Sequence, residues 1–225
     1  MDTTALALSL KLAFWTCVIL LPLAVFIGRL LAWRDFTGKA LVEAAIALPL
    51  VLPPTVLGFY LLLGMGATST LGQYYHALTG RHLVFSFDGL LLASVIFNLP
   101  FAIQPLQRAF EAIPLQTREA AWCCGLSPAQ TLWRIELPLA WSGAVSALAL
   151  TFAHTLGEFG VVLMVGGNIE AETKTIAISI YDRVQALDNH SAGLMSAVLL
   201  LFSLLSIGLV YRLSQRARKH VQSRP

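Results

Sequence analysis

The sequence predicts an all-α protein, a polytopic transmembrane helix bundle of about five spans. Of its 225 residues, 57% are hydrophobic and only 12% are charged, which gives a mean hydropathy of +0.73. A soluble domain carries about 25% charged residues, so this chain has too little polar surface to cover a body in water. Its apolar residues also gather in long runs, as a lipid-embedded chain requires.

A helix crosses the hydrocarbon core with about 20 mostly uncharged residues. Five stretches qualify: residues 12–31, 44–65, 89–107, 139–165 and 191–211. The first lacks a clear small-residue cleavage site, so we expect a retained span rather than a signal peptide. We expect residues 1–225 to form a single transmembrane domain, with a cytoplasmic loop at residues 108–138.

Basic residues predict the orientation. With the C-terminus inside, eleven of the fifteen Lys and Arg residues lie on the inner side, and Lys11, Arg81, Lys174 and Arg183 remain outside. Cytoplasmic loops are enriched in Lys and Arg, so we expect the N-terminus outside and the C-terminus in the cytoplasm. The basic tail at residues 216–219 would anchor this topology on anionic membrane lipid. A net charge of +3 does not indicate nucleic-acid binding.

The inner loop is predicted to contain two short helices joined by a turn at Gly125, which adopts positive φ without steric cost. Residues 118–124 form the first helix. Ser127-Pro128 has the pattern of an N-cap followed by a first-turn proline, and opens a second helix that runs to about Ile135. Leu137-Pro138 then ends that helix and starts the fourth span.

A rigid helix pair at the membrane face is suited to docking a partner, and a compact connector is the alternative. Charged residues at its ends, Arg118 with Glu119 and Arg134 with Glu136, are expected to pair across the interface with that partner. On the outer side, residues 175–187 have helical periodicity and are expected to lie along the surface or to dip partway into the membrane.

The inner loop resembles the EAA motif of type I permease subunits of ABC importers. The signature residues are Glu119, Ala120, Ala121, Gly125, Ile135, Leu137 and Pro138. The resemblance implies that this loop, with Leu126, Ser127 and Pro128, forms coupling helices that dock on a separate ATP-binding subunit. The sequence contains no GxxxxGK[ST] loop. ATP and Mg²⁺ would therefore be bound by the partner, and no cofactor is expected on this chain.

Four further stretches resemble the molybdate permeases of this family: residues 36–40, 47–54, 152–160 and 168–176. The resemblance implies a homodimer in the cytoplasmic (inner) membrane, with an ATP-binding subunit dimer and a periplasmic or extracellular substrate-binding protein. The expected cargo is an oxyanion, molybdate first. Sulfate permeases share two of these elements, so sulfate, tungstate or thiosulfate is the alternative.

Polar side chains are costly in hydrocarbon and therefore mark candidates for the translocation path or gate. The candidates are Asn98, Gln104, His154 and Glu158, with the small residues Gly157 and Gly160 beside them. His154 and Glu158 are four residues apart and are expected to share a helical face. The two glycines are expected to permit close helix packing.

Two other classes of function remain open. A proton-coupled secondary carrier would transport without an ATPase, and an intramembrane enzyme would use His154 and Glu158. A metal site needs more ligands than this pair provides, and the three cysteines have no ligand spacing. We therefore expect a transport subunit without catalytic residues or a bound metal.

Overall fold

The computed structural model describes residues 2–222, without the side chains of residues 209–210 and 213–222. The predicted lipid anchor at residues 216–219 thus lies outside the described side chains. The described chain is helical throughout and contains no strand. Its helices are α1 (Thr3–Trp33), α2 (Lys39–Val51), α3 (Pro54–Met65), α4 (Thr70–Thr79), α5 (Phe87–Glu111), α6 (Leu115–Cys123), α7 (Pro128–Thr131), a π-helical turn (Leu132–Glu136), α8 (Leu137–Leu139), α9 (Trp141–Gly157), α10 (Gly160–Gly166), α11 (Ile176–Gln185) and α12 (Asn189–Gln222).

Three single helices of the described chain, α1, α5 and α12, are long and apolar enough to cross a membrane. Two bent pairs bring the number up to five: α2 with α3, at an angle of 114°, and Pro128–Leu139 with α9, at 72°. The first bend lies at Pro53 and Pro54, which have no backbone N–H to continue the ladder of α2. The predicted all-α membrane bundle is confirmed.

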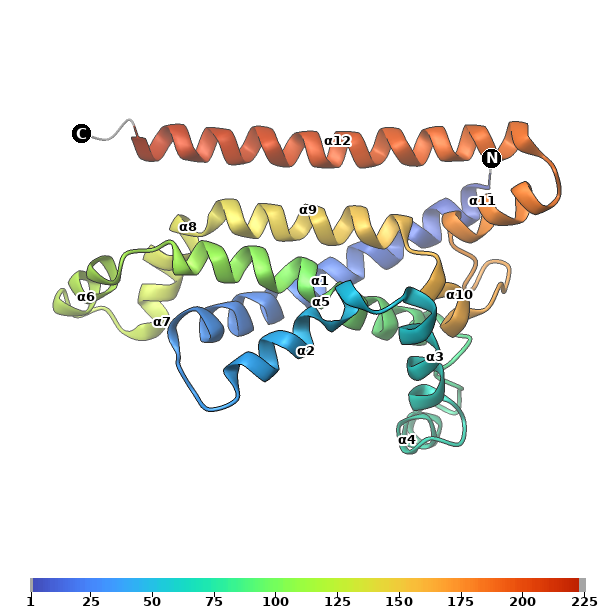
Figure 1. The fold of residues 1–225 in the computed structure, drawn as a ribbon, viewed down its shortest axis with the longest axis horizontal. Helices are drawn as coiled ribbons and strands as arrows, with labels where there is room; N and C mark the ends of the chain where they lie inside the picture. Colours follow the sequence, from blue (N-terminus) through green and yellow to red (C-terminus); the bar gives the residue numbers. More distant parts are fainter. Residues whose placement is uncertain (1, 223–225) are drawn as a thin grey trace.

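Helices α1, α5 and α9 form the centre of the bundle (Figure 1). Two glycines let their backbones approach closely. A Cβ atom on Gly28 of α1 would lie 3.1 Å from the Gln107 nitrogen of α5, and one on Gly143 of α9 would collide with Ala109 and the Pro105 carbonyl. Small residues at such contacts are the usual basis of helix association in membranes.

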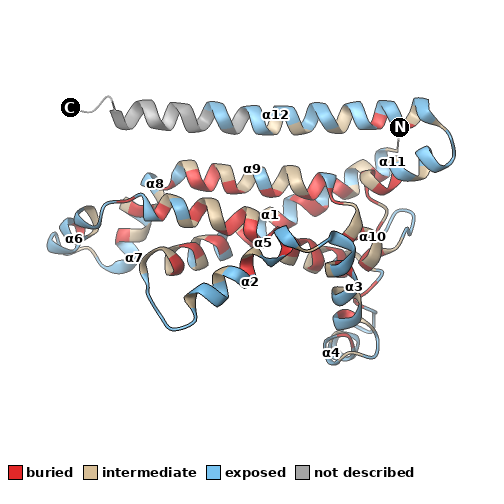
Figure 2. Cartoon of the chain, viewed as in Figure 1, coloured by how far each residue is buried: buried red, intermediate tan, exposed pale blue. Residues whose placement is uncertain are grey.

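The main apolar core fills the space between these three helices and α2. It includes Leu20, Ala24 and Leu31 of α1, Ile46 of α2, Ala102, Ile103, Leu106 and Phe110 of α5, and Ala144 and Ala147 of α9. Figure 2 shows these buried residues along the facing sides of the helices, whereas α12 presents mostly exposed residues over its described part. Leu200, Leu201, Leu204 and Leu205 of α12 are each more than half exposed, as expected of a helix surrounded by lipid.

The connecting segments gather at the two ends of the bundle. The inner loop, with α6 and α7, lies at one end of the long axis, and α4, α10 and α11 lie at the other (Figure 1). The helix predicted within residues 175–187 is present as α11. Helix α4 was not predicted, although Ser69 caps its first turn and Gly80, with φ 70°, ends it.

The predicted fourth span, residues 139–165, is wrong at its outer end. Helix α9 ends at Gly157, Glu158 adopts an extended backbone with ψ 127°, and α10 is a separate short helix. The break lies at Glu158, a single charge within an otherwise apolar run, and one charge does not by itself predict the end of a helix.

Candidate functional site

The inner loop is built by strong local signals. Gly125 ends α6 with φ 81°, where the amides of Gly125 and Leu126 donate to the carbonyls of Trp122 and Ala121. This is the Schellman pattern that glycine favours. Ser127 then opens α7 with a reciprocal capping box: its hydroxyl accepts from the Gln130 amide, and the Gln130 side chain accepts from the Ser127 amide. The predicted turn and N-cap are thus present.

A buried carboxylate fixes this loop to the transmembrane bundle. Glu136, in the π-helical turn, is fully buried. One of its oxygens lies 2.6 Å from Nε of Arg29, near the end of α1, and the other lies 3.2 Å from Nε of Arg118, in α6. The Arg118 guanidinium also stacks 3.5 Å from the centroid of the Trp33 ring. Glu136, Arg29, Arg118 and Trp33 are called the clamp below.

The clamp corrects one expectation. Arg118 and Glu136 were expected to pair with a partner across an interface, but they pair with each other and with Arg29 inside the chain. Arg29 is the residue of the clamp that the sequence reasoning missed. The sequence did point to Arg29, because a lone arginine near the inner end of an apolar span needs a counter-charge.

The exposed surface of the loop comprises most of its signature residues. Glu119, Ala120, Gly125, Ser127, Pro128 and Pro138 are exposed. Leu126, Ile135 and Leu137 are half-buried, and Ala121 is buried beneath them. Glu119 makes no ion pair within the described part of the chain. The loop therefore presents a small, rigid surface with one free carboxylate.

A second polar site lies inside the bundle, where Asn98 of α5 joins the two ionisable candidates. The Asn98 amide nitrogen lies 3.4 Å from Oε2 of Glu158, and its amide oxygen lies 3.0 Å from Nδ1 of His154. Ser94, one turn before Asn98, donates to Glu158 and accepts from Thr16 of α1. Asn98 and Glu158 are buried, and one Glu158 oxygen has no partner among the described residues.

His154 and Glu158 do not share a helical face as expected, because α9 ends between them. The structure brings them together through the Asn98 side chain instead. His154 also stacks on Phe101, with ring centroids 4.0 Å apart. The residues that hold this cluster, Ser94 and Thr16, were not predicted, since hydroxyls are unremarkable in an apolar sequence.

The remaining candidates lie apart from this cluster. Gln104 is half-buried and lines a cavity of 390 Å³ between α2 and α5, together with Glu43 and Gln107. Gly160 meets the expectation of close packing, because a Cβ atom there would lie 2.9 Å from Cβ of Pro54 in α3. Gly157 does not meet it, since a Cβ atom there would have open space around it.

The end of the bundle that carries α11 has a further set of charge contacts. Lys174 lies 2.8 Å from a carboxylate oxygen of Asp182 in α11, and the Asn168 amide donates to the same oxygen. Partial burial raises the pKa of Asp182, but the hydrogen bonds from Lys174 and Asn168 outweigh it and hold that pKa below its ordinary value. The same contact with Asp182 raises the pKa of Lys174.

Among the described residues, no group of three or more His, Cys, Asp or Glu side chains could hold a metal ion. The described chain is thus a helical membrane bundle that carries a capped, exposed helix pair on a buried ionic anchor. The chain belongs to the family of binding-protein-dependent transport system inner membrane components, which it matches over residues 21–219. This is a family of membrane transport components rather than enzymes.

The molybdenum permeases among the relatives are similar over almost their whole length. The chain is 45% identical to the molybdenum transport system permease protein ModB of Azotobacter vinelandii, over 93% of each chain. It is 33% identical to the protein of the same name from Escherichia coli K12, over 94% of each. The sulfate transport system permease protein CysT of Synechocystis is 31% identical, over 86% of this chain and 68% of that one.

Solved structures share the fold. A bacterial ABC transporter that imports the acidic polysaccharide alginate superposes with a TM-score of 0.77 at 14% identity, covering 95% of this chain and 79% of that one. An amino acid ABC transporter with histidines superposes with a TM-score of 0.63 at 18% identity, covering 96% and 93%.

Proposed function

We propose that this chain is the permease subunit of an ATP-driven ABC importer that carries molybdate into the cytoplasm. It would act as a single transmembrane domain over residues 1–225, with residues 108–138 as the coupling loop. Two copies would enclose a path, and a dimer of ATP-binding subunits would dock on the two coupling loops. The names and the extent of the relatives support the substrate.

The observation that carries the proposal is the clamp beneath an exposed helix pair. A loop that only connected two spans would need neither a reciprocal cap nor a fully buried carboxylate with two arginine partners. Burying a charge is costly unless it is paired, so the clamp is stable only while the loop keeps one position on α1. A fixed position is what the transfer of movement from a docked subunit requires.

The exposed signature residues support the docking surface. Ala120 and Gly125 let another backbone approach closely, and Glu119 offers a charge that is not used elsewhere in the described chain. ATP and Mg²⁺ would be bound by the docked subunit. A substrate-binding protein would deliver the oxyanion at the opposite end. A similar solved structure supports this kind of partner, since it is a bacterial alginate ABC transporter in complex with a periplasmic protein that holds an alginate pentasaccharide.

The cluster of Asn98, His154 and Glu158 is proposed as a gate element. It joins α5 to the break after α9, so movement of α10 against α3 must lengthen or replace its hydrogen bonds. Gly157 and Gly160 flank this break on either side, and Gln104 would face the path nearer the inner end. The orientation proposed from the basic residues places the N-terminus outside and the C-terminus in the cytoplasm.

The test is oxyanion uptake by proteoliposomes that contain this chain and its ATP-binding subunit, with the substrate-binding protein supplied outside. Labelled molybdate should accumulate with ATP inside, and excess sulfate should compete weakly. Glu119→Lys should abolish uptake and copurification of the ATPase while membrane insertion stays normal. Normal uptake by this variant, or full-speed uptake without any ATPase, contradicts the proposal and favours a secondary carrier.

Sulfate is the second candidate substrate, because permeases named for sulfate are 30–32% identical over most of this chain. The same assay separates the two. Labelled sulfate uptake that excess molybdate fails to inhibit would assign the chain to sulfate.

A further inference from the structure

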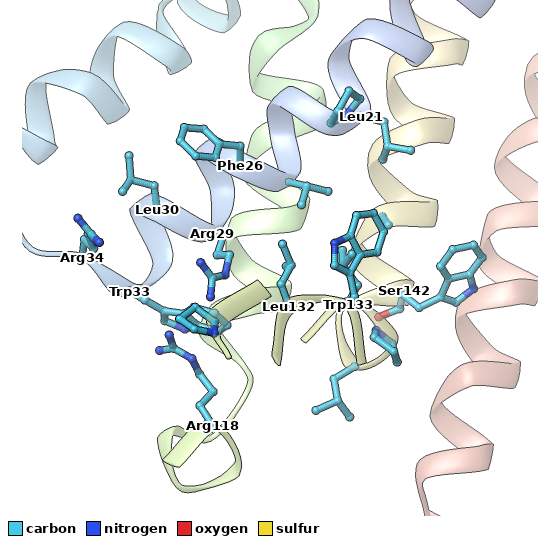
Figure 3. A pocket seen from close by; sticks show the side chains of 18 of the residues that line it. Leu21, Phe26, Arg29, Leu30, Trp33, Arg34, Arg118, Leu132, Trp133 and Ser142 are labelled. Carbon is cyan, nitrogen blue, oxygen red and sulfur yellow. The ribbon is translucent and has the colours of Figure 1, made fainter. Parts of the chain in front are cut away.

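A large groove opens beside the clamp. It has a volume of 1780 Å³ and is formed by the inner half of α1, the inner loop and the first turn of α9. This exceeds the roughly 300–1,000 Å³ of pockets for drug-sized ligands. Figure 3 shows Leu21 and Phe26 toward one end of the groove, and Arg29, Trp33, Arg34 and Arg118 toward the other.

The tryptophans of the chain are concentrated here. Of the five in the sequence, four line the groove: Trp33, Trp122, Trp133 and Trp141. Trp133 and Trp141 are more than half exposed. Tryptophan is enriched where hydrocarbon meets the polar headgroups, so this concentration marks the groove as a membrane–water boundary.

The polar end carries net positive charge. Arg29, Arg34 and Arg118 all line it, and Glu136 supplies one carboxylate to the first and third of them. Arg34 is exposed and forms no ion pair in the described part of the chain. The nearby Asp35 pairs with Lys39 instead. The two guanidinium groups of the clamp share one carboxylate, so one positive charge of the clamp and the charge of Arg34 are not neutralised within the described chain.

The depth of the groove corresponds to one leaflet. From Leu21 to Arg34, α1 rises by ~20 Å at about 1.5 Å per residue. Half of a bilayer core is about 15 Å thick. The apolar wall from Leu21 to Leu30 therefore matches acyl chains in length, and the arginines and tryptophans fall at the level of the headgroups.

We propose that this groove binds one anionic phospholipid of the leaflet on the side of the coupling loop. Its acyl chains lie against Leu21, Val25 and Phe26, and its phosphate lies between Arg34 and Arg118. The proposal rests on the proposed function only in naming that leaflet the cytoplasmic one. Guanidinium groups bind phosphate with two parallel hydrogen bonds, and basic pockets at helix ends bind anionic headgroups in other membrane proteins.

Two other occupants fit less well. A second copy of the chain across a two-fold axis would bring the same positive end against itself, because such an interface uses one surface patch twice. A water-soluble subunit docked on the loop does not reach Leu21 or Phe26, which belong to the first membrane span. Lipid alone supplies both an apolar body and an anionic head at this depth.

The four tryptophans provide the assay. The Trp15→Phe variant, which leaves only groove tryptophans, is placed in phosphatidylcholine nanodiscs with one copy per disc. A small fraction of the lipid is replaced by brominated phosphatidylglycerol or by brominated phosphatidylcholine. We expect the anionic lipid to quench the fluorescence at several-fold lower mole fraction. In the same background, Arg34→Gln should reduce this preference about fivefold, the effect of one basic residue near an anionic surface.

The matched control is Arg108→Gln, which removes an exposed arginine at the inner end of α5, outside the groove. It should keep the full preference. Equal quenching by the two lipids, or an unchanged preference in Arg34→Gln, overturns the proposal. So does loss of the preference when two copies share one disc, which would assign the groove to a second copy. Native mass spectrometry should find phosphatidylglycerol retained by the parent chain and depleted in Arg34→Gln. None of these readouts measures transport, so they remain informative if the substrate assignment fails.

Discussion

Glu119 and Glu136 are two carboxylates of the same loop with opposite surroundings. Glu136 is fully buried between Arg29 and Arg118, whereas Glu119 is exposed. The same chemical change at the two positions therefore tests two different roles. Position 136 should govern the order of the loop, and position 119 should govern its interaction with a partner.

Glu136→Gln should release the loop from α1. Removing one charge of a buried pair costs about 3–5 kcal/mol, and we expect about 2–3 kcal/mol here because the Arg29 side chain is 27% exposed. Hydrogen exchange of the amides of residues 115–139 should accelerate, and uptake should fall. Glu119→Gln is the control, and its exchange should match the parent chain. Unchanged exchange in Glu136→Gln would show that the clamp does not hold the loop.

The contact between Lys174 and Asp182 should make the outer loop sensitive to extremes of pH. Because the pKa of Asp182 is lowered, its contribution is complete above the unfolded pKa of about 3.9 and is lost as the pH falls through the folded value. The raised pKa of Lys174 makes its contribution complete below about 10.4, with loss as the pH rises further.

Amide protection factors of residues 169–174 should therefore be flat between about pH 4 and about pH 10 and fall outside that window. Lys174→Met should lower the protection factors at every pH in this window. The corresponding loss in the free energy of opening is up to about 1 kcal/mol, because the pair is partly exposed. Arg183→Met removes a more exposed partner, that of Asp188, and should have little effect. Unchanged protection factors in the Lys174→Met variant would contradict this account.

At the scale of helices, the seam between α10 and α3 depends on two glycines. A Cβ atom on Gly160 would lie 2.9 Å from Pro54, and one on Gly58 would lie 2.9 Å from Met164. These helices follow the break after α9 and the bend after α2, so their contact fixes the position of both irregular segments. It also supports the Asn98 cluster, since Glu158 immediately precedes α10.

Gly160→Leu should force α10 away from α3. Overpacking of this kind costs about 1–3 kcal/mol, so the apparent Tm in detergent should fall by several degrees and uptake should decrease. Gly157→Ala is a matched control, because a Cβ atom there meets nothing within 4 Å. Equal melting temperatures for the two variants would show that the contact between α10 and α3 accommodates the larger side chain.

The sequence predicted these elements unevenly, for physical reasons. The loop was predictable because its signals are local: Gly125 at a positive φ, and Ser127 with Pro128 at a helix start. The clamp was not, because Arg29 and Glu136 are 107 residues apart. The break at Gly157 was not, because no proline marks the end of the helix and Glu158 is only a single charge in an apolar run.

At the scale of the whole molecule, the chain exposes two apolar surfaces, one at the bend between α2 and α3 and the other along α12. Val51, at the bend, is 80% exposed, and Leu201 on α12 is 57% exposed. In the proposed homodimer we expect the broken α2–α3 pair to line the path and face the second copy, and α12 to face lipid. The packing of one chain does not reveal this difference, since both surfaces are equally apolar.

Cysteine cross-linking can separate the two surfaces. Cys17, Cys123 and Cys124 are first replaced by serine, because the last two are exposed. Val51→Cys in this background should then give a covalent dimer in native membranes, and Leu201→Cys should not. The reverse result would place α12 at the dimer interface and α2–α3 in lipid.

Helix α1 connects the two faces of the molecule without a break. Its inner end is tied to Glu136, and at its outer end the Asp2 carboxylate accepts a hydrogen bond from Ser179 in α11. The 31 residues of α1 form a rod ~45 Å long at about 1.5 Å per residue. Displacement of the loop would therefore tilt α1 and move α11 at the same time. Nucleotide turnover on one side of the membrane would then be transmitted to the other side.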